Sequence, residues 1–289
     1  MSEQCRCFEE RSFDVNDLEI RARYWPVDNG LPVVAIHGWM DNAASFDALA
    51  KQLPGCEVLA LDLAGNGLSG WRSGHGSYNI WDDFIDILAV ADEMGWEQFH
   101  LLGHSRGAIV SFLLTSAMPD RIASLAVIDG MLPFATGMEE TVSQMRQYLL
   151  DQKVNRERSS RTYSTLEEVL EKRCEKNGLS HDECMPLLER ALKKTSNGQY
   201  AWTHDLRIHG ASAIKLTQEH IQQFIDALQR PTLMVAAEQG MASWEELMQL
   251  AKEHEFMTPS VVPGGHHLHM TAASAPLVAE AISAWQSTL

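Results

Sequence analysis

The stretch that decides the fold is Phe99-His100-Leu101-Leu102-Gly103-His104-Ser105-Arg106-Gly107-Ala108. An apolar run of strand length leads into Gly-x-Ser-x-Gly, and the helical pattern Ala108–Met118 follows at once. A strand, a sharp turn and a helix in this order are the context that a nucleophile elbow requires. The two glycines lack the Cβ atoms that would clash where strand and helix come close. The segment therefore predicts Ser105 as a nucleophile at the top of a sheet, with a plain strand–helix turn as the alternative.

On both sides of this segment, short apolar runs alternate with helical patterns, which indicates βαβ units and a parallel sheet. From about Leu132 to Asp226 the chain is instead mostly helical and polar, with no strong strand. The charged run at residues 155–161 there reads as a solvated face or loop. The expected strands are Leu18–Trp25, Val33–Ile36, Glu57–Leu61, His100–Gly103, Leu125–Ile128, Thr232–Ala237 and Ser260–Val262. The expected helices are Ala43–Leu53, Ile80–Met94, Ala108–Met118, Thr141–Val154, Leu166–Lys176, Asp182–Lys194, Glu219–Leu228, Ser243–Glu253 and Ala275–Trp285.

This change of pattern predicts one α/β core with an insertion. We expect residues 1–131 and 229–289 to form the core and residues 132–228 to form a helical cap over the carboxyl edge of the sheet, where ligands bind in open α/β folds. Met131, Met138 and Met145 lie near the expected cleft and would line an adaptable apolar pocket. Plain core packing is the alternative for these methionines.

The expected base lies after the last strand, in Pro263-Gly264-Gly265-His266-His267-Leu268-His269. A serine hydroxyl needs an adjacent base to act as a nucleophile at neutral pH, and on folds with this elbow the histidine comes last in the chain. His266 is the first choice because it directly follows the glycine pair, and His267 is the second. His269 would support the loop. A metal site is disfavoured because no carboxylate or cysteine lies within several residues.

Attack on a carbonyl also requires donors for the developing oxyanion. The backbone N–H of Arg106 is one candidate, because it follows the nucleophile at the start of a helix. The backbone N–H of Trp39 is the other, because His37-Gly38-Trp39 stands at the carboxyl end of an expected strand. The Trp39 ring would wall the substrate pocket, with core packing as the alternative.

These motifs together resemble the α/β-hydrolase superfamily over nearly the whole chain. The resemblance rests on His37–Asn42, Asp62–Ser69, Gly103–Gly107 and Gly264–His266, and the stretch from His37 onward is most similar to serine hydrolase-like proteins. It implies a mostly parallel eight-stranded sheet that is flanked by helices and carries a helical cap. It also implies chemistry with no metal and no cofactor.

The chain departs from the common family pattern at the triad acid. Many members carry Asp in a turn after the seventh strand, but here that stretch reads Ala237-Glu238-Gln239-Gly240, with Gly240 where the Asp would stand. Asp129 ends the apolar strand Leu125–Ile128 and is the preferred replacement. Glu238 is the alternative acid. A further alternative is that Asp129 only caps the turn at Gly130.

Two further aspartates invite simpler interpretations. We expect Asp62 to cap the Gly65–Gly67 turn rather than to serve as the acid. Asp205 is expected to form an ion pair with Arg207 or another base that ties the cap to the core, with a substrate contact as the alternative.

Composition excludes several classes of function. The 289 residues carry 23 Lys and Arg against 39 Asp and Glu, a net charge of −16, which argues against nucleic acid and anionic membranes as partners. No secretory signal and no apolar run of spanning length is visible, so we expect a cytoplasmic protein without membrane insertion. The five cysteines are odd in number and scattered, which argues against a disulfide framework. Cys5 and Cys7 could supply part of a metal site, but this interpretation is disfavoured.

The function that these features favour is hydrolysis of a small-molecule carboxylic ester by Ser105, His266 and Asp129. A perhydrolase or haloperoxidase-like activity is an alternative, because a Trp after His-Gly also occurs in that group. A hydrolase-fold ligand receptor with slow turnover is the alternative from a different class. The sequence does not decide the acyl or alcohol preference or the oligomeric state.

Overall fold

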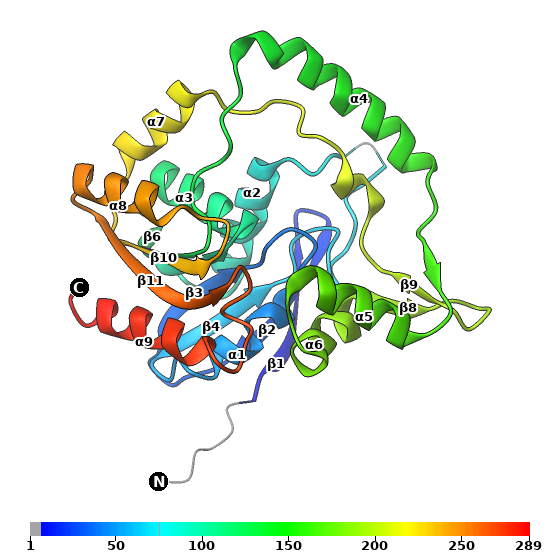
Figure 1. Ribbon diagram of the computed structural model, residues 1–289, viewed down its shortest axis with the longest axis horizontal. Helices are drawn as coiled ribbons and strands as arrows, with labels where there is room; N and C mark the ends of the chain where they lie inside the picture. Colours follow the sequence, from blue (N-terminus) through cyan, green and yellow to red (C-terminus); the bar gives the residue numbers. More distant parts are fainter. Residues whose placement is uncertain (1–6, 75) are drawn as a thin grey trace.

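The computed structural model describes residues 7–74 and 76–289 and is built on one eight-stranded sheet (Figure 1). Two pairs of neighbouring strands at one edge of this sheet are antiparallel: Glu9–Val15 with Leu18–Trp25, and Leu18–Trp25 with Cys56–Leu61. All other neighbouring strands are parallel. The mostly parallel eight-stranded sheet expected from the sequence is therefore confirmed. The strand order is β1 (Glu9–Val15), β2 (Leu18–Trp25), β4 (Cys56–Leu61), β3 (Leu31–Ile36), β5 (Phe99–His104), β6 (Ile122–Ile128), β10 (Thr232–Gln239) and β11 (Met257–Gly265).

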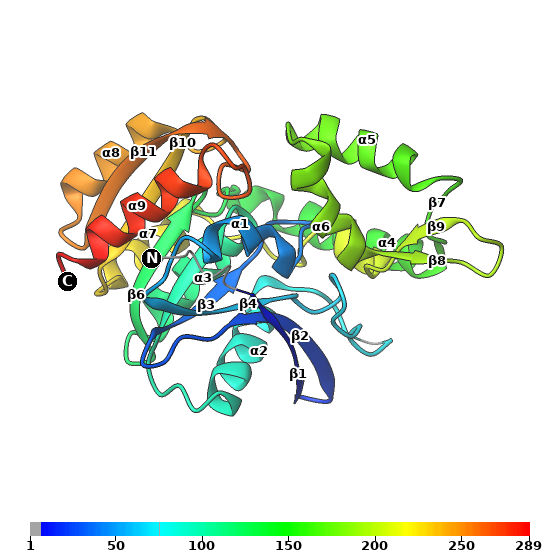
Figure 2. The same cartoon turned by 90° about the horizontal axis from the view of Figure 1, so that it is seen from below.

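Both faces of the sheet are buried, because successive side chains of a strand point to opposite faces. On β3, Val34 and Ile36 belong to one hydrophobic cluster and Val33 and Ala35 to another. The first cluster is covered by α2 (Ile80–Glu93), α3 (Arg106–Ala117), α7 (Gln218–Ala227) and α8 (Trp244–Glu253). The second is covered by η1 (Ala43–Phe46), α1 (Asp47–Ala50) and α9 (Ala275–Gln286), and Figure 2 shows α1 and α9 on the face opposite α2. This double cover explains why the expected strands read as continuous apolar runs.

The segment between β6 and α7 extends away from the sheet, with α4 forming an outer arch (Figure 1). It contributes most of a third hydrophobic cluster, including Val169, Leu170 and Leu188, and this cluster also contains Ala44 and Met270 of the core. Its elements are η2 (Met138–Glu140), α4 (Thr141–Glu157), β7 (Thr162–Tyr163), α5 (Leu166–Asn177), α6 (His181–Ala191), β8 (Leu192–Lys194), β9 (Tyr200–Trp202) and η3 (Leu206–His209).

No strong strand is expected in this segment, and the structure has three short ones there: β7, β9 and β8 form a three-stranded antiparallel sheet. The expected helix Asp182–Lys194 ends at Ala191, since Leu192 adopts extended backbone angles and its strand pairs with Tyr200–Trp202. The turn between the two strands places Gly198 at φ 81°. The pairing across this turn, rather than local propensity, decides the conformation.

Buried ion pairs attach the inserted segment to the core. Arg190 of α6 donates its Nε–H to both carboxylate oxygens of Asp62 at 2.9 Å. Asp62 also accepts the backbone N–H of Leu68 at 2.8 Å, so its expected turn-capping role is confirmed. Asp205 pairs with Arg207 at 2.5 Å, as expected, and accepts the Tyr78 hydroxyl at 2.7 Å. These contacts fix the insertion beside the carboxyl edge of the sheet.

Candidate active site

The nucleophile elbow is built by the junction of β5 and α3. Ser105 stands between them at φ 52° and ψ −117°, a strained conformation for a residue with a side chain. A Cβ on Gly107 would lie 2.1 Å from the carbonyl oxygen of Ile36, and one on Gly103 would lie 2.6 Å from the Cα of Ala108. Both glycines are therefore required by close backbone approach, as the sequence predicts, and Ser105 is held at the edge of the sheet.

Three side chains from distant parts of the sequence meet at this elbow. The Nε2 atom of His266 lies 2.9 Å from the Ser105 hydroxyl oxygen. The Nδ1 atom of the same ring lies 2.5 Å from Oδ2 of Asp129. Ser105 follows β5, Asp129 follows β6, and His266 follows β11, so the parallel sheet brings all three to one edge. The result is a continuous hydrogen-bonded chain from carboxylate to imidazole to hydroxyl.

The Asp129 carboxylate is held in place by backbone donors. Its Oδ2 accepts the N–H of Met241 at 2.7 Å, and its Oδ1 accepts those of Ala237 and Ala242 at 3.2 and 3.3 Å. Burial alone would raise the pKa of Asp129, but the hydrogen bonds from His266 and these amides outweigh it and lower the pKa. Asp129 is therefore ionised at neutral pH and fixes His266 with a proton on Nδ1.

The alternative acid lies elsewhere. Glu238 is exposed near the end of β10, whereas the carboxylate beside His266 belongs to Asp129. A Cβ on Gly240 would lie 2.1 Å from Oδ1 of Asp129. The Asp129 carboxylate thus occupies the space that a side chain at position 240 would need, which explains why glycine stands where many relatives of the fold carry their acid.

The other two histidines of the loop lie in a buried cluster behind His266. His269 is fully buried, with its ring centre 4.1 Å from that of His104. His267 lies 3.6 Å from a carboxylate oxygen of Asp41, which also pairs with Arg173. Burial acts to raise the pKa of Asp41. The hydrogen bond from His267 and the charge of Arg173 act in the opposite direction and together hold the pKa below its usual range.

Burial is also the largest influence on the two innermost rings. It lowers the pKa of His104 to about 3 and that of His269 well below its usual value, so both rings are neutral. Within residues 7–74 and 76–289, no group of three or more His, Cys, Asp or Glu side chains is arranged to hold a metal ion. Cys5 lies outside the described residues, and Cys7 is exposed. The Nε2 atom of His104 lies 2.9 Å from the backbone carbonyl oxygen of His266, so the cluster contacts the loop that carries His266.

The residues that carry the two candidate oxyanion donors line one crevice, and Arg106 directly follows Ser105 in the chain. Trp39 and Arg106 line the same narrow crevice, and the Arg106 N–H belongs to the first turn of α3, where backbone donors lack intrahelical partners. The guanidinium of Arg106 turns aside to pair with Asp83 at 2.7 Å. The Trp39 ring is 52% exposed and packs edge-on to His209, with ring centres 5.9 Å apart. It lines a neighbouring cavity rather than the one at Ser105.

A cavity of about 680 Å³ opens at Ser105, Asp129 and His266. Met131 is part of its wall, whereas Met138 and Met145 are not among its lining residues. Walls from α7 and α8 were not identified from the sequence, because contacts between distant helices leave no local signal. Its apolar lining includes Ile109, Met131, Leu132, Phe134, Ile225 and Leu247, and its polar lining includes Gln218, Gln222, Ser243 and Glu246.

Comparison with known families agrees with this geometry. Residues 32–273 match the model of the alpha/beta hydrolase fold family. The chain belongs to this family. Membership of this family supports a hydrolase function. Among the helices that the structure describes, none is both long and apolar enough to cross a membrane.

Relatives of this α/β-hydrolase include serine hydrolase-like proteins. A Dictyostelium discoideum serine hydrolase-like protein is 26% identical over 89% of this chain and 76% of its own. The human serine hydrolase-like protein 2 is 28% identical over 87% of this chain and 86% of its own. A solved hypothetical protein from Pseudomonas aeruginosa PAO1 is 38% identical with a TM-score of 0.91, covering 96% of this chain and 99% of that one. The expected resemblance is confirmed.

Proposed function

We propose that this α/β-hydrolase cleaves a carboxylic ester through Ser105, His266 and Asp129. The supporting observation is the hydrogen-bonded chain in which His266 links the Ser105 hydroxyl to a buried carboxylate. Because Asp129 accepts a hydrogen bond from the Nδ1–H group of His266, the Nε2 atom is left free to accept the proton of Ser105.

The reaction proceeds in two halves. Ser105 Oγ attacks the ester carbonyl carbon while His266 Nε2 takes the hydroxyl proton, and the N–H groups of Trp39 and Arg106 bind the developing oxyanion. The tetrahedral intermediate collapses, and His266 returns the proton to the leaving alcohol. Water then attacks the acyl-enzyme by the same route and releases the acid. Asp129 stabilises the transient imidazolium without taking its proton.

The segment 132–228 acts as a cap in this proposal. Leu132 and Phe134 at its start and Gln222 near its end line the cavity at Ser105, while Ile221 and Ile225 anchor its last helix on the core. The cap therefore sets how long an acyl or alcohol chain fits.

The role of the cap is tested by filling the cavity. Gln222→Trp should shift preference among p-nitrophenyl esters toward short chains, because Gln222 lines the cavity. Gln223→Trp is the matched control on the neighbouring, exposed position of α7. An identical chain-length profile for both variants contradicts the assignment of this wall to substrate selection.

The proposed activity is tested with a fluorophosphonate probe followed by p-nitrophenyl esters from acetate to long chains. We expect labelling at Ser105 and turnover, and both should be lost in Ser105→Ala. Labelling without turnover would favour a ligand receptor, and peroxide-dependent halogenation in the presence of acetate would favour a perhydrolase. Turnover that persists in Ser105→Ala removes Ser105 from the nucleophile role.

A further inference from the structure

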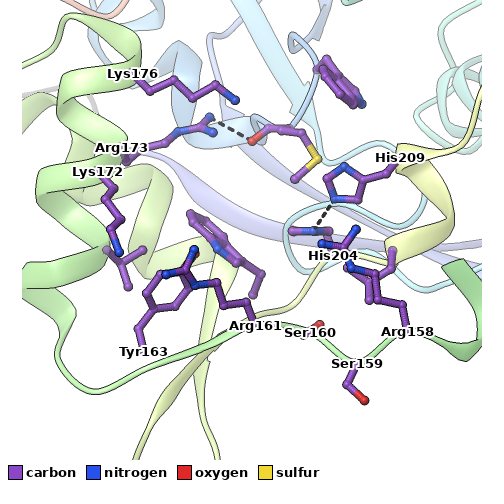
Figure 3. Close-up of a pocket in the computed structure, with 15 residues that line it drawn as sticks. Arg158, Ser159, Ser160, Arg161, Tyr163, Lys172, Arg173, Lys176, His204 and His209 are labelled. Carbon is purple, nitrogen blue, oxygen red and sulfur yellow. Dashed lines mark hydrogen bonds between the residues drawn. The ribbon is translucent and has the colours of Figure 1, made fainter.

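A second cavity of about 400 Å³ lies beside the loop that carries Trp39 and Met40 (Figure 3). One wall is α5, which contributes Lys172, Arg173 and Lys176. The opposite wall is formed by residues 202–209, and the chain that follows α4 closes the remaining side. This volume falls in the range of sites that hold small molecules. The cavity is separate from the one that contains Ser105.

The lining of this cavity is cationic in an acidic protein. Five of its 15 lining residues are Arg or Lys and none is Asp or Glu, although the chain as a whole has a net charge of −16. A concave surface of one charge sign focuses the field and attracts ligands of the opposite sign. The five cationic residues are Arg158, Arg161, Lys172, Arg173 and Lys176.

Three of these cations have no carboxylate within ion-pair distance in the described part of the chain. Lys172 pairs with Glu168 at 2.7 Å, and Arg173 pairs with Asp41. Arg158, Arg161 and Lys176 form no ion pair within residues 7–74 and 76–289. Arg161 lies over the ring of Tyr163, another lining residue, at 5.1 Å, and none of the three charges is consumed by an ion pair of the described residues.

The two histidines at the opposite wall have lowered pKa values, chiefly because they are buried. Burial lowers the pKa of His204 to about 4. Burial, then the charges of Arg158 and Lys176, lower the pKa of His209. The two rings contact each other through their Nε2 atoms at 3.1 Å and are neutral at pH 7. They therefore offer polar atoms for a hydrogen bond with a ligand without adding to the charge.

The cavity adjoins the proposed catalytic centre through the oxyanion loop. Trp39 and Met40 line it and also line the crevice that contains Arg106, the residue after Ser105. The backbone carbonyl of Met40 accepts a hydrogen bond from Arg173 at 2.9 Å, which links the cationic wall to this loop (Figure 3). Trp39 and Met40 thus lie between the cationic cavity and the crevice at Arg106, which follows Ser105 in the chain.

We propose that this cationic cavity binds a compact oxyanion group of the substrate: a carboxylate, phosphate or sulfate. The inference rests on the proposed ester hydrolysis and narrows its substrate class. The ester has an apolar part that occupies the cavity at Ser105 and an anionic part that reaches Arg158, Arg161 and Lys176. Hydrogen bonds between such cations and an oxyanion are stronger than neutral ones and give preference for the charged ligand.

Binding is tested first, without catalysis. Thermal unfolding of the wild-type protein is followed with added inorganic phosphate, sulfate or acetate, at ionic strength matched with sodium chloride. We expect at least one oxyanion to raise the melting temperature above the chloride control. The rise should vanish in Arg158→Gln/Arg161→Gln/Lys176→Gln and persist in Lys193→Gln/Lys215→Gln/Lys252→Gln, which removes the same charge from exposed positions outside the cavity.

Catalysis is tested with paired esters of equal length, one anionic and one neutral. In one pair the anionic ester carries its charge on the acyl chain, and in another on the alcohol. Each is made with a carboxylate and with a phosphate, so the results show which part of the ester reaches the cationic cavity and which anion it prefers. We expect kcat/KM for at least one anionic ester to exceed its neutral partner by about 10- to 100-fold, the preference that one or two charge-assisted hydrogen bonds confer. This ratio should fall with added salt and collapse in the cavity variant but not in the control variant.

The outcomes separate this inference from the proposed function. Equal turnover of neutral and anionic esters with no oxyanion-dependent rise in melting temperature overturns the inference and leaves ester hydrolysis standing. Loss of the preference in both triple variants overturns it as well, because the effect would then be one of net charge. If no ester is cleaved, the binding measurement alone decides whether the cavity takes an oxyanion. The salt dependence of the wild-type protein gives an answer even if a variant does not fold.

Discussion

Replacing Asp129 by Asn should abolish activity and also destabilise the protein. The carboxylate accepts from four donors: the ring of His266 and the backbone N–H groups of Ala237, Met241 and Ala242. An asparagine amide must direct its NH₂ group at one of the two oxygen positions. At either position the NH₂ donor would face N–H groups that the wild-type carboxylate accepts, so donors would oppose donors.

The magnitude follows from these contacts. If the amide nitrogen faces His266, the ring must present Nδ1 as an acceptor and carries its proton on Nε2, where it cannot accept the Ser105 proton. We expect kcat to fall on the order of 10⁴-fold, as for other triads with the wrong tautomer. One buried donor without an acceptor costs about 1–3 kcal/mol of unfolding free energy. Esterase kinetics and urea unfolding measure the two effects separately.

A compensating pair of substitutions sharpens this test. In Asp129→Gly/Gly240→Asp, the carboxylate moves to the neighbouring turn and enters the space that Asp129 vacates, because a Cβ at position 240 points at the present carboxylate. We expect part of the lost kcat to return. Glu238→Gln is the control and should leave kcat nearly unchanged, since Glu238 is exposed. Full activity in Asp129→Asn, or a dead Glu238→Gln, would refute the assignment of the acid.

Three other predictions follow from the same geometry. Gly107→Ala should lower the unfolding free energy by about 1–3 kcal/mol and impair activity, because its Cβ would overlap a carbonyl oxygen of β3; wild-type stability in urea would contradict this. His266→Ala should lower kcat on the order of 10⁴- to 10⁶-fold, and His267→Ala by about tenfold or less, since His267 does not contact Ser105; the reverse order would move the base by one residue. Because burial lowers the pKa values of His104 and His269, their neutral forms favour the folded state, so stability is full above pH ~6.5 and falls on acidification. The loss from His104 is roughly 2 kcal/mol at pH 5, and His269 adds to it in the same direction. Denaturant midpoints that stay flat between pH 7 and 5 would show that the rings are not buried as neutral groups.

The parts of the fold that sequence predicts best are those set by local pattern. The strand that leads into Ser105 and the helix after it are found where expected, because the strand, the two glycines and the helix are adjacent in the sequence. The strands β7, β8 and β9 were missed because they have only two or three residues each, and their conformation depends on pairing between chain segments. The first strand, Glu9–Val15, was missed as well: most of its residues are exposed, and it pairs at the edge of the sheet.

The candidate site shows the same division. Asp129 and His266 are 137 residues apart, and the sequence could only rank Asp129 against Glu238 by their places at strand ends. The direction of the Trp39 ring was not predictable, because it depends on His209 in the inserted segment. The charged run at residues 155–161 was expected to be solvated. Its exposed Arg158 and Arg161 also line a cavity that forms only when α5 packs opposite them.

The central claim is that Ser105 forms an acyl-enzyme during ester hydrolysis. The most direct measurement is a rapid-quench experiment with p-nitrophenyl acetate, which combines p-nitrophenol release in the first turnover with mass spectrometry of the quenched protein. We expect a burst of up to one p-nitrophenol per protein molecule and an acetyl adduct on Ser105, in the peptide that contains residues 99–108. An adduct on a different residue, or turnover that continues in Ser105→Ala with no adduct at all, would contradict it.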